Sequence, residues 1–438
     1  MSEEQKKNES GRTEERSHHE HHHGEHHHKH HHRKKKKKRK PIPLPKFMKT
    51  KKFWVNMGII LGTVILLAAI GLLAKHRQSE GTLTPGSASG KQWSEGQNVS
   101  ISVSFFDEAV PLVGEAVSAL TEAEWQTPAD DVLKPYRNDK FRLDVSSPVI
   151  LNYDITGLGA AHAVVGATVE VSETEDFRKP LVIERDHVRS IKISNLKTGT
   201  EYFYRINIAV SNGQTLAVQG SFQTAKSPRI LSVEGAVNVR DIGGWKTGNG
   251  ETVRQGMIYR GSELDGAVES SFKLTSAGME TMLQTLGIRK DLDLRAESEN
   301  PYGIDALGAG VEHIYFDMPM YAELFTEQGK AKVGELFSLL AEESNYPVYI
   351  HCTYGLDRTG TVCALLEALL GVGKDDILMD YRLSGLYHKN IPQNSMEDFL
   401  VQLEACPGYN LQEKAEKFLL SAGVTEEEIT EIRRIMLQ

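Results

Sequence analysis

The stretch Pro347-Val-Tyr-Ile-His-Cys-Thr-Tyr-Gly-Leu-Asp-Arg-Thr-Gly-Thr-Val362 decides the fold of the second half of the chain. Its first residues are β-branched or aromatic, which favours a buried strand, and the apolar run at 362–370 favours a core helix. Gly355 allows a sharp turn between the two. The stretch therefore predicts a strand, a tight loop and a helix that starts where the loop ends.

The cysteine loop, residues 352–358, lies at this helix N-terminus, where unpaired N–H groups and the helix dipole favour a bound anion such as phosphate. Five residues separate Cys352 from Arg358. The backbone between them can surround one phosphate group while the guanidinium binds two of its oxygens. The same positive surroundings favour a thiolate nucleophile at Cys352. Alternatively, Cys352 is an ordinary core cysteine and Arg358 an ordinary surface arginine. That interpretation gives no reason for the order of strand, loop and helix around them, whereas a phosphate site requires it.

The sequence HCTYGLDRTG resembles the signature of cysteine-dependent protein tyrosine phosphatases. Three more motifs are similar to the bacterial tyrosine and dual-specificity branch of that family: NVRDIGGW at 238–245, YRGSEL at 259–264 and DLR at 293–295. The resemblance extends from about residue 228 to the end of the chain. It implies attack of the cysteine on phosphorus, a cysteinyl-phosphate that water hydrolyses, and no metal or other cofactor.

Within the loop, Cys352 is expected to be the nucleophile and Arg358 the cation that stabilises the transition state, with backbone N–H groups around the phosphate oxygens. His351 is expected to orient the loop. Thr359 is expected either to contact the sulfur or only to start the helix. The predicted phosphate-binding residues are Thr353, Tyr354, Gly355, Leu356, Asp357 and Arg358.

Two aspartates compete for the role of general acid, which protonates the leaving oxygen. Asp357 lies in the loop, at the position that the similar bacterial branch is thought to use, and is the preferred candidate. Asp317, in the sequence FDMP, occupies the kind of place where the larger superfamily keeps its acid on a mobile loop. The sequence leaves this choice open.

The charged residues of the upstream motifs are expected to form buried networks that support the loop. They are Arg240, Asp241, Arg260, Asp293 and Arg295. Related loops carry Lys, which suits phosphoinositide headgroups, where this chain has Leu356. We therefore expect phosphotyrosine in proteins as the substrate. Phosphoinositides or inositol phosphates are the first alternative, and a scaffold that binds phosphate without catalysis is the second.

The composition limits the other classes of function. The 438 residues are too many for one typical domain, and the net charge of −8 conceals a strong asymmetry. Residues 1–52 hold 17 Lys and Arg against 7 acidic residues, so the remainder is strongly acidic. An acidic remainder argues against nucleic acid as a partner of the folded part. Only three cysteines are present, and their spacing suggests neither a disulfide framework nor a zinc site.

The first 98 residues predict a membrane-anchored arrangement. Residues 1–52 are expected to be a disordered tail whose eleven histidines at 18–32 bind divalent metal weakly or are simply solvated. Residues 53–74 carry no charge and can span a hydrocarbon core of about 30 Å, which predicts one uncleaved transmembrane helix. Because twelve Lys and Arg at 33–52 precede it, the N-terminus is expected in the cytoplasm and the catalytic domain outside the cell. Residues 75–98 are expected to be a flexible linker.

Short strands follow, which predicts an all-β sandwich at 99–226. The segment LKTGTEYFYRINIAVSNGQTLAVQGSFQTA, residues 196–225, resembles the end of a fibronectin type III domain, in which Leu196 and Tyr202 or Tyr204 would form a tyrosine corner. Such a domain is expected to be a spacer or a module that binds substrate protein or wall polymer. The strands are expected at 98–106, 148–155, 167–172, 180–184, 188–196, 201–211 and 215–224.

From residue 227 to the end, strands alternate with helices, which predicts an α/β cysteine-phosphatase domain with a central, largely parallel sheet. The cysteine loop is then expected at the carboxyl end of a strand. Strands are expected at 256–259, 290–294, 311–316 and 347–350, and helices at about 275–286, 329–343, 358–371, 375–384, 395–404, 411–421 and 425–436.

Overall fold

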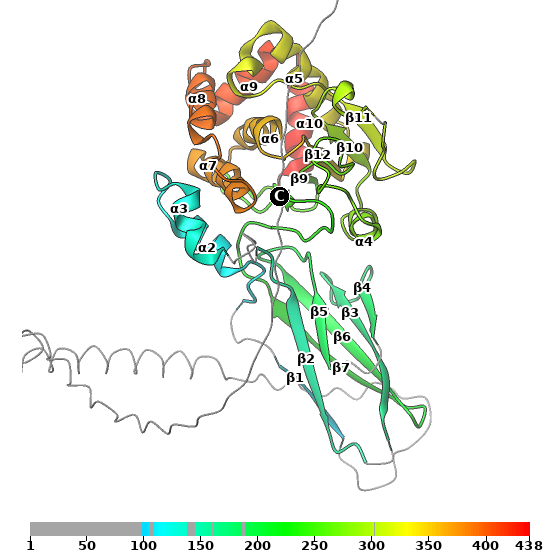
Figure 1. The fold of residues 1–438 in the computed structure, drawn as a ribbon. Coiled ribbons are helices and arrows are strands. Elements are labelled where there is room, and N and C mark those ends of the chain that lie inside the picture. The colour runs from blue at the N-terminus through cyan, green and yellow to red at the C-terminus, as the bar shows by residue number, and fades with distance from the viewer. Residues whose placement is uncertain (1–98, 105–108, 138–144, 160–161, 186–188, 302) are drawn as a thin grey trace, which may run out of the picture. The chain divides into compact units, whose positions relative to one another are not determined.

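The computed structural model describes residues 99–104, 109–137, 145–159, 162–185, 189–301 and 303–438 (Figure 1). The predicted tail, transmembrane helix and linker, residues 1–98, lie outside these ranges. Among the described residues, no helix is both long and apolar enough to cross a bilayer.

The first strands form two antiparallel sheets, labelled β1 to β7 in Figure 1, with the orders β1-β2-β5 and β4-β3-β6-β7. Inward-facing residues alternate along each strand, so that Leu151, Val169 and Ile206 are fully buried in one core. A hairpin turn at Asn212-Gly213 joins β6 to β7, and Gly213 has the positive φ of +81° that such turns require. The strands are β1 Ser100–Ser104, β2 Val149–Thr156, β3 Val164–Ser172, β4 Leu181–Arg185, β5 Ser190–Ile193, β6 Glu201–Val210 and β7 Thr215–Gln223.

Two helices that the sequence analysis did not expect lie between β1 and β2. They are α2 (Glu115–Glu122) and α3 (Ala129–Leu133), followed by the short turn η2 (Lys134–Tyr136). We call residues 115–136 the α2–α3 insertion. Its buried face includes Leu120 and Leu133, which belong to a small apolar cluster separate from the sandwich core.

The second half of the described chain contains a five-stranded sheet with the order β11-β10-β12-β9-β8. The four strands β9 to β12 run parallel to one another, which confirms the predicted largely parallel sheet. The edge strand β8, which was not predicted, pairs antiparallel with β9. The strands are β8 Arg240–Asp241, β9 Ile258–Gly261, β10 Lys290–Asp293, β11 Glu312–Tyr315 and β12 Val348–His351.

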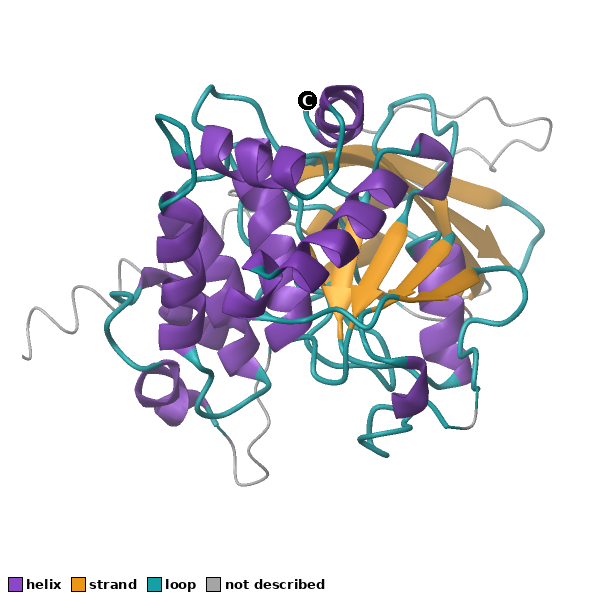
Figure 2. Ribbon diagram, turned by 90° about the horizontal axis from the view of Figure 1, so that it is seen from above, coloured by secondary structure: helices purple, strands orange, loops and turns teal. Residues whose placement is uncertain are grey.

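Helices cover both faces of this sheet (Figure 2). In β12, Val348 and Ile350 face the large core formed with α5, α6, α9 and α10, whereas Tyr349 faces the opposite core beside Met282. The buried central strand therefore ends inside the domain, where the cysteine loop begins. The helices are α4 Ser276–Glu280, continued by the turn η3 Thr281–Thr285, α5 Glu327–Leu340, α6 Asp357–Leu370, α7 Lys374–Arg382, α8 Gln393–Glu404, α9 Leu411–Ser421 and α10 Glu426–Met436.

Candidate active site

The cysteine loop connects the end of β12 to the start of α6, as the sequence predicted, and Cys352 is buried with 5% of its surface exposed. Gly355 has φ +66°, and a Cβ atom there would lie 2.3 Å from the carbonyl oxygen of Gly261 at the end of β9. Only glycine fits this close approach of two backbones. The loop is thus held tightly against the sheet.

The carbonyl oxygens of residues 353–355 all accept hydrogen bonds from the surrounding domain. By contrast, the N–H groups of residues 353–356 find no acceptor among the described residues. A loop whose carbonyls are held from behind presents its N–H groups to an anion. The donors to the carbonyls are the Glu263 N–H to Thr353 (3.0 Å), Asn238 Nδ2 to Tyr354 (3.2 Å) and Gly355 (3.0 Å), Arg260 Nη2 to Gly355 (2.9 Å) and His388 Nε2 to Tyr354 (3.0 Å).

Arg358 is held on one edge of its guanidinium. Its Nη1 lies 2.9 and 3.2 Å from the two carboxylate oxygens of Glu299, which ends the turn η4 (Glu297–Glu299) and itself accepts from the Ala296 N–H at 3.0 Å. Nε and Nη2 of Arg358 have no protein acceptor within the described ranges, so the other edge can bind a phosphate in a bidentate manner. Sequence analysis missed Glu299 because no motif marks it.

The two candidate acids lie in different settings. Asp357, half-buried in the first turn of α6, accepts a hydrogen bond of 2.6 Å from the Tyr321 hydroxyl, which lies 2.7 Å from the Tyr381 hydroxyl. Asp317 is exposed and has φ +45°, an unusual backbone conformation for a residue other than glycine. The carboxylate of Asp357 therefore has a fixed position, and that of Asp317 is free to turn.

A pocket of about 500 Å³ brings Asp317 and Arg358 together. Strand β11 and the turn η5 (Tyr321–Phe325) position its floor, because Met318 and Leu324 are buried in the large core. The pocket is open to solvent, and Arg358 is among the residues that line it. It is lined by Asp317, Met318, Pro319, Met320, Glu323, Thr326, Gln328, Gly329 and Arg358.

Behind the loop, two of the predicted arginines share one carboxylate that the sequence analysis missed. Asp380, in α7, lies 2.8 Å from Arg240 Nε and 2.5 Å from Arg260 Nη1, and all three side chains are buried. Arg260 also donates to Gly355, so this Asp380 cluster directly supports the loop. Burial first, and then the charge of Asp380, raise the pKa of the neighbouring Glu367, which keeps this carboxyl neutral.

Asp241 does not join the Asp380 cluster, and the expectation that it lies under the loop is wrong. Its carboxylate lies 2.7 Å from Arg229 Nη1 and accepts from the N–H groups of Gly243 and Gly256. Neighbouring residues on a strand point to opposite faces, so Arg240 and Asp241 cannot both face the loop. Asp241 instead fixes Arg229, whose Nε donates to the carbonyl of Leu196 at 3.1 Å.

The remaining predicted support residues form a second buried network, the Arg295 cluster. Arg295 pairs with Asp293 and with two acids that the sequence analysis missed, Glu263 and Asp265. The same cluster reaches the residue before the nucleophile, because Asp293 lies opposite His351 in the register of β10 and β12. A further carboxylate, Asp291, lies between His351 Nε2 at 3.1 Å and His313 Nδ1 at 3.2 Å.

These carboxylates keep both histidines protonated. Burial alone would lower the pKa of His351, but the charges of Asp293 and Asp291 raise it to about 9. For His313, hydrogen bonding to Asp291 and Asp293 likewise overcomes burial and raises the pKa to about 10. The other ring nitrogen of His351, Nδ1, lies 3.2 Å from the carbonyl oxygen of Cys352. A cation therefore lies next to the nucleophile at neutral pH.

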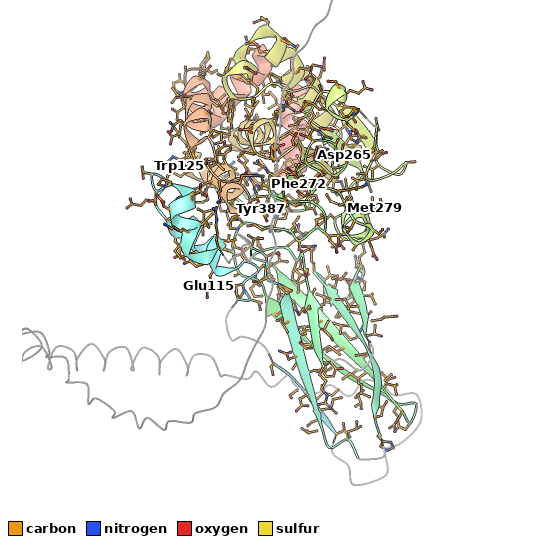
Figure 3. The ribbon with its side chains drawn as sticks, in the orientation of Figure 1. Glu115, Trp125, Asp265, Phe272, Met279 and Tyr387 are labelled. Carbon is orange, nitrogen blue, oxygen red and sulfur yellow. The ribbon has the colours of Figure 1, made fainter. Side chains whose placement is uncertain are left out.

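Three aromatic rings stand beside the loop. Tyr354 is 41% exposed, and its ring meets Phe272 edge-on at 5.9 Å and His388 edge-on at 5.3 Å. We call these three residues the aromatic wall; Phe272, labelled in Figure 3, comes from the segment before α4. On the inner side, the buried hydroxyl of Thr359 has no hydrogen-bond partner among the described residues. Within those residues, no group of side chains could hold a metal ion.

These features place a buried cysteine and an arginine in one loop on an α/β fold. Residues 231–438 match the model of the tyrosine phosphatase family. A protein of Cupriavidus necator that carries a tyrosine-protein phosphatase name is 27% identical over 203 residues, covering 39% of this chain and 71% of the relative. The tyrosine-protein phosphatase of Nostoc commune is 30% identical over 146 residues, covering 28% of this chain and 49% of the relative.

Among solved structures, the core catalytic domain of the PP-IP phosphatase SIW14 from S. cerevisiae, in complex with citrate, is 17% identical. It has a TM-score of 0.26 and covers 38% of this chain and 88% of that structure.

Proposed function

We propose that this chain is a membrane-anchored phosphatase that hydrolyses phosphotyrosine in proteins through a cysteinyl-phosphate intermediate. The observation that supports the proposal most strongly is the orientation of the peptide groups in the cysteine loop. Its carbonyls are held from behind while its N–H groups and one edge of Arg358 remain available, and Cys352 lies at its start. This arrangement is electrostatic preorganisation for a phosphoryl group in the transition state.

The reaction proceeds in two displacements. The Cys352 sulfur attacks phosphorus, the bond from phosphorus to the tyrosyl oxygen breaks, and Asp357 gives its proton to that leaving oxygen. Water then attacks the cysteinyl-phosphate, losing a proton to the same carboxylate, and releases inorganic phosphate and the thiolate. Tyr321 supports this assignment because its hydroxyl fixes the Asp357 carboxylate at 2.6 Å. Asp317 is the alternative acid, since it shares a pocket with Arg358.

The aromatic wall favours an aryl phosphate over an inositol phosphate. Tyr354, Phe272 and His388 offer ring faces and edges to a tyrosine ring, and such contacts stabilise aromatic pairs. Leu356, at the position where related loops carry Lys, is buried with 8% exposure and brings no charge to the site. Phosphoinositides or inositol polyphosphates are the second candidate.

The decisive experiment measures phosphate release from phosphotyrosine peptides and from phosphoinositides by the full chain, with Cys352→Ser as the inactive control. Faster turnover of phosphoinositides would overturn the substrate assignment. Normal function of Cys352→Ser would instead support a scaffold that binds phosphate without catalysis.

A parallel comparison of Asp357→Asn and Asp317→Asn assigns the acid. We expect Asp357→Asn to reduce kcat by about 10²-fold or more on a peptide, because general acid catalysis contributes about 10²–10⁴-fold. The loss should be much smaller on an aryl phosphate whose leaving group needs no proton. The opposite ranking of the two variants would assign the role to Asp317.

The proposed anchor is residues 53–74, with the N-terminus in the cytoplasm and the catalytic domain outside the cell. Support comes from the uncharged run and the twelve basic residues before it. Protease added to intact cells should then remove the folded domains, and full protection would show the opposite orientation. Weak divalent-metal binding by the histidines at 18–32 is part of the same proposal and can be measured by titration of the full chain with Zn²⁺.

We also propose that residues 99–226 form a fibronectin type III-like domain. Two observations support it: the sheet orders β1-β2-β5 and β4-β3-β6-β7, and the Tyr202 hydroxyl, which accepts from the Lys197 N–H at 2.9 Å. The latter contact is that of a tyrosine corner and favours Tyr202 over Tyr204 for this role. Replacement of Tyr202 by Phe should lower the stability of the sandwich by about 1 kcal/mol, the usual contribution of one hydrogen bond.

A further inference from the structure

The α2–α3 insertion lies within the sandwich region of the sequence. Its buried side chains, however, pack against residues of the phosphatase region and not against the sandwich core. Leu120 and Leu133 are fully buried, and their cluster includes Ile230, Leu383 and Leu386. Leu383 and Leu386 form the ends of the turn η7 (Leu383–Leu386), which directly follows α7. The insertion and η7 therefore share one apolar interior.

Polar contacts reinforce this interface. Arg382, the last residue of α7, is fully buried, and its Nη1 and Nη2 donate to the carbonyls of Ala123 (2.9 Å) and Thr127 (2.6 Å) in the insertion. Its guanidinium also lies 5.9 Å from the ring centre of Trp125, which is labelled in Figure 3 between α2 and α3. The Trp125 Nε1 donates to Glu397 in α8.

A second set of contacts lies at α3. The Asp130 carboxylate accepts from the Asn390 N–H at 2.9 Å and pairs with Arg137 at 2.8 Å. Gly385, in the middle of η7, approaches the insertion so closely that a Cβ atom there would lie 2.8 Å from the Cβ of Ala129. The insertion thus contacts residues 382–390 along their length.

The same segment contacts the cysteine loop on its other side. The Ser384 hydroxyl lies 3.2 Å from Asn238 Nδ2, and that amide donates to the Tyr354 and Gly355 carbonyls. His388 Nε2 lies 3.0 Å from the same Tyr354 carbonyl. Residues 384–388 therefore lie between the insertion and the groups that orient the loop.

We propose that the α2–α3 insertion is a positioning element for the phosphatase reaction. By fixing residues 382–390 it fixes Ser384 and His388, and through them it keeps the loop carbonyls turned away from the anion site. The kinetic consequence rests on the proposed phosphatase function, whereas the physical coupling does not. On this view the sandwich region is part of the catalytic unit and more than a spacer.

A steric wedge at Gly385 tests the proposal in the full chain. Gly385→Ala places a methyl group against Ala129, which should displace η7 and lower kcat for p-nitrophenyl phosphate by about tenfold, because small displacements of positioned groups have large effects on rate. The variant should also speed hydrogen exchange of the Glu263 amide, which donates to the Thr353 carbonyl of the loop. The double variant Gly385→Ala, Ala129→Gly removes the opposing methyl group and should restore both kcat and exchange.

Recovery of kcat and exchange in the double variant is the informative result. If Gly385 were needed only for the local structure of η7, a change at Ala129 in α3 would not restore them. Wild-type kcat and exchange in folded Gly385→Ala, or a double variant no better than the single one, would overturn the proposal. Inactivity of the wild-type chain towards p-nitrophenyl phosphate would count against the proposed function alone, because exchange of the Glu263 amide is measured without turnover.

If Gly385→Ala does not fold, Trp125→Phe provides the same test with a milder change. It removes the hydrogen bond to Glu397 but keeps an aromatic ring beside Arg382. We expect about a threefold lower kcat, as for loss of a hydrogen bond of about 0.7 kcal/mol, with KM unchanged. Unchanged kcat and unchanged exchange of the Glu263 amide in this variant would contradict the positioning role.

Discussion

The Asp380 cluster and the Arg295 cluster both lie buried behind the cysteine loop, but they have opposite charge balance. In the first, two guanidinium groups share one ionised carboxylate, and Glu367 beside them is kept neutral by burial. In the second, one guanidinium faces several carboxylates, and the balance depends on two protonated histidines.

This difference separates two tasks. The Asp380 cluster bonds directly to the loop through Arg260 and contributes positive charge near the expected phosphate. The Arg295 cluster instead joins the ends of β10 and β12 to residues 263–265 and places the cation of His351 beside Cys352. The second network includes two histidines whose pKa values are raised to about 9 and about 10, so its pH dependence can be tested.

The largest effect is expected from Asp380→Asn. Loss of the carboxylate leaves two buried guanidinium groups without their counter-ion, and removal of one partner of a buried pair typically costs about 3–5 kcal/mol. The free energy of unfolding, measured with urea, should fall by about that amount, together with kcat. Asp375→Asn, an exposed change in the same helix, is the matched control. Equal stability of the two variants would show that the shared carboxylate is not needed.

A smaller effect is expected from pH in the Arg295 cluster. The folded pKa values of His351 and His313 lie above the ordinary 6.5, so their stabilisation is complete below about pH 6.5 and is lost as the pH rises through 9 and 10. We expect the free energy of unfolding to fall by at least about 2 kcal/mol between pH 7 and 10, since one pKa unit corresponds to about 1.4 kcal/mol.

The variant His313→Gln isolates this contribution from other groups that titrate in the same range. It should be less stable than the parent chain at pH 7, and its stability should fall less steeply from pH 7 to 10. Parallel stability curves for the two proteins would mean that His313 is not protonated in the folded state.

The smallest effect is expected from the hydrogen bonds that link Tyr381, next to Asp380, through Tyr321 to Asp357. Tyr381 follows Asp380 in α7 and reaches Asp357 through Tyr321, so Tyr321→Phe frees the proposed acid. We expect kcat to fall by about threefold to tenfold, in line with one lost hydrogen bond of about 1 kcal/mol. Tyr346→Phe, which loses a bond of 2.6 Å to the Leu340 carbonyl, is the control for stability and should keep kcat.

Much of the α/β region could be predicted because its signals are local. Apolar periodicity located the four parallel strands and the helices from α4 to α10 to within a few residues, and the loop between β12 and α6 followed from its residue types. The wrong assignment of Asp241 has a simple cause: a motif shows that residues are charged, but strand alternation decides which of them face the loop.

The missed residues are those that only the tertiary fold brings together. Asp380 is 140 residues from Arg240, and Glu299 is 59 residues from Arg358. Asp380 is one of three aspartates in helix α7, so its residue type does not distinguish it, and no motif marks Glu299. The α2–α3 insertion was missed for a related reason, because its helices are short and their apolar faces are completed by a distant turn.

The contact between Gly355 and Gly261 has a consequence for how such an enzyme can diversify. The backbones of Gly355 and Gly261 pack directly against each other, which fixes the position of the cysteine loop relative to β9. A Cβ atom at Gly261 would in turn lie 2.3 Å from the Tyr349 hydroxyl. The backbone that would hold the phosphoryl group under the proposed function therefore does not depend on the side chain of the exposed Tyr354. We expect substitutions at that position to change the preference among leaving groups without altering the proposed chemistry.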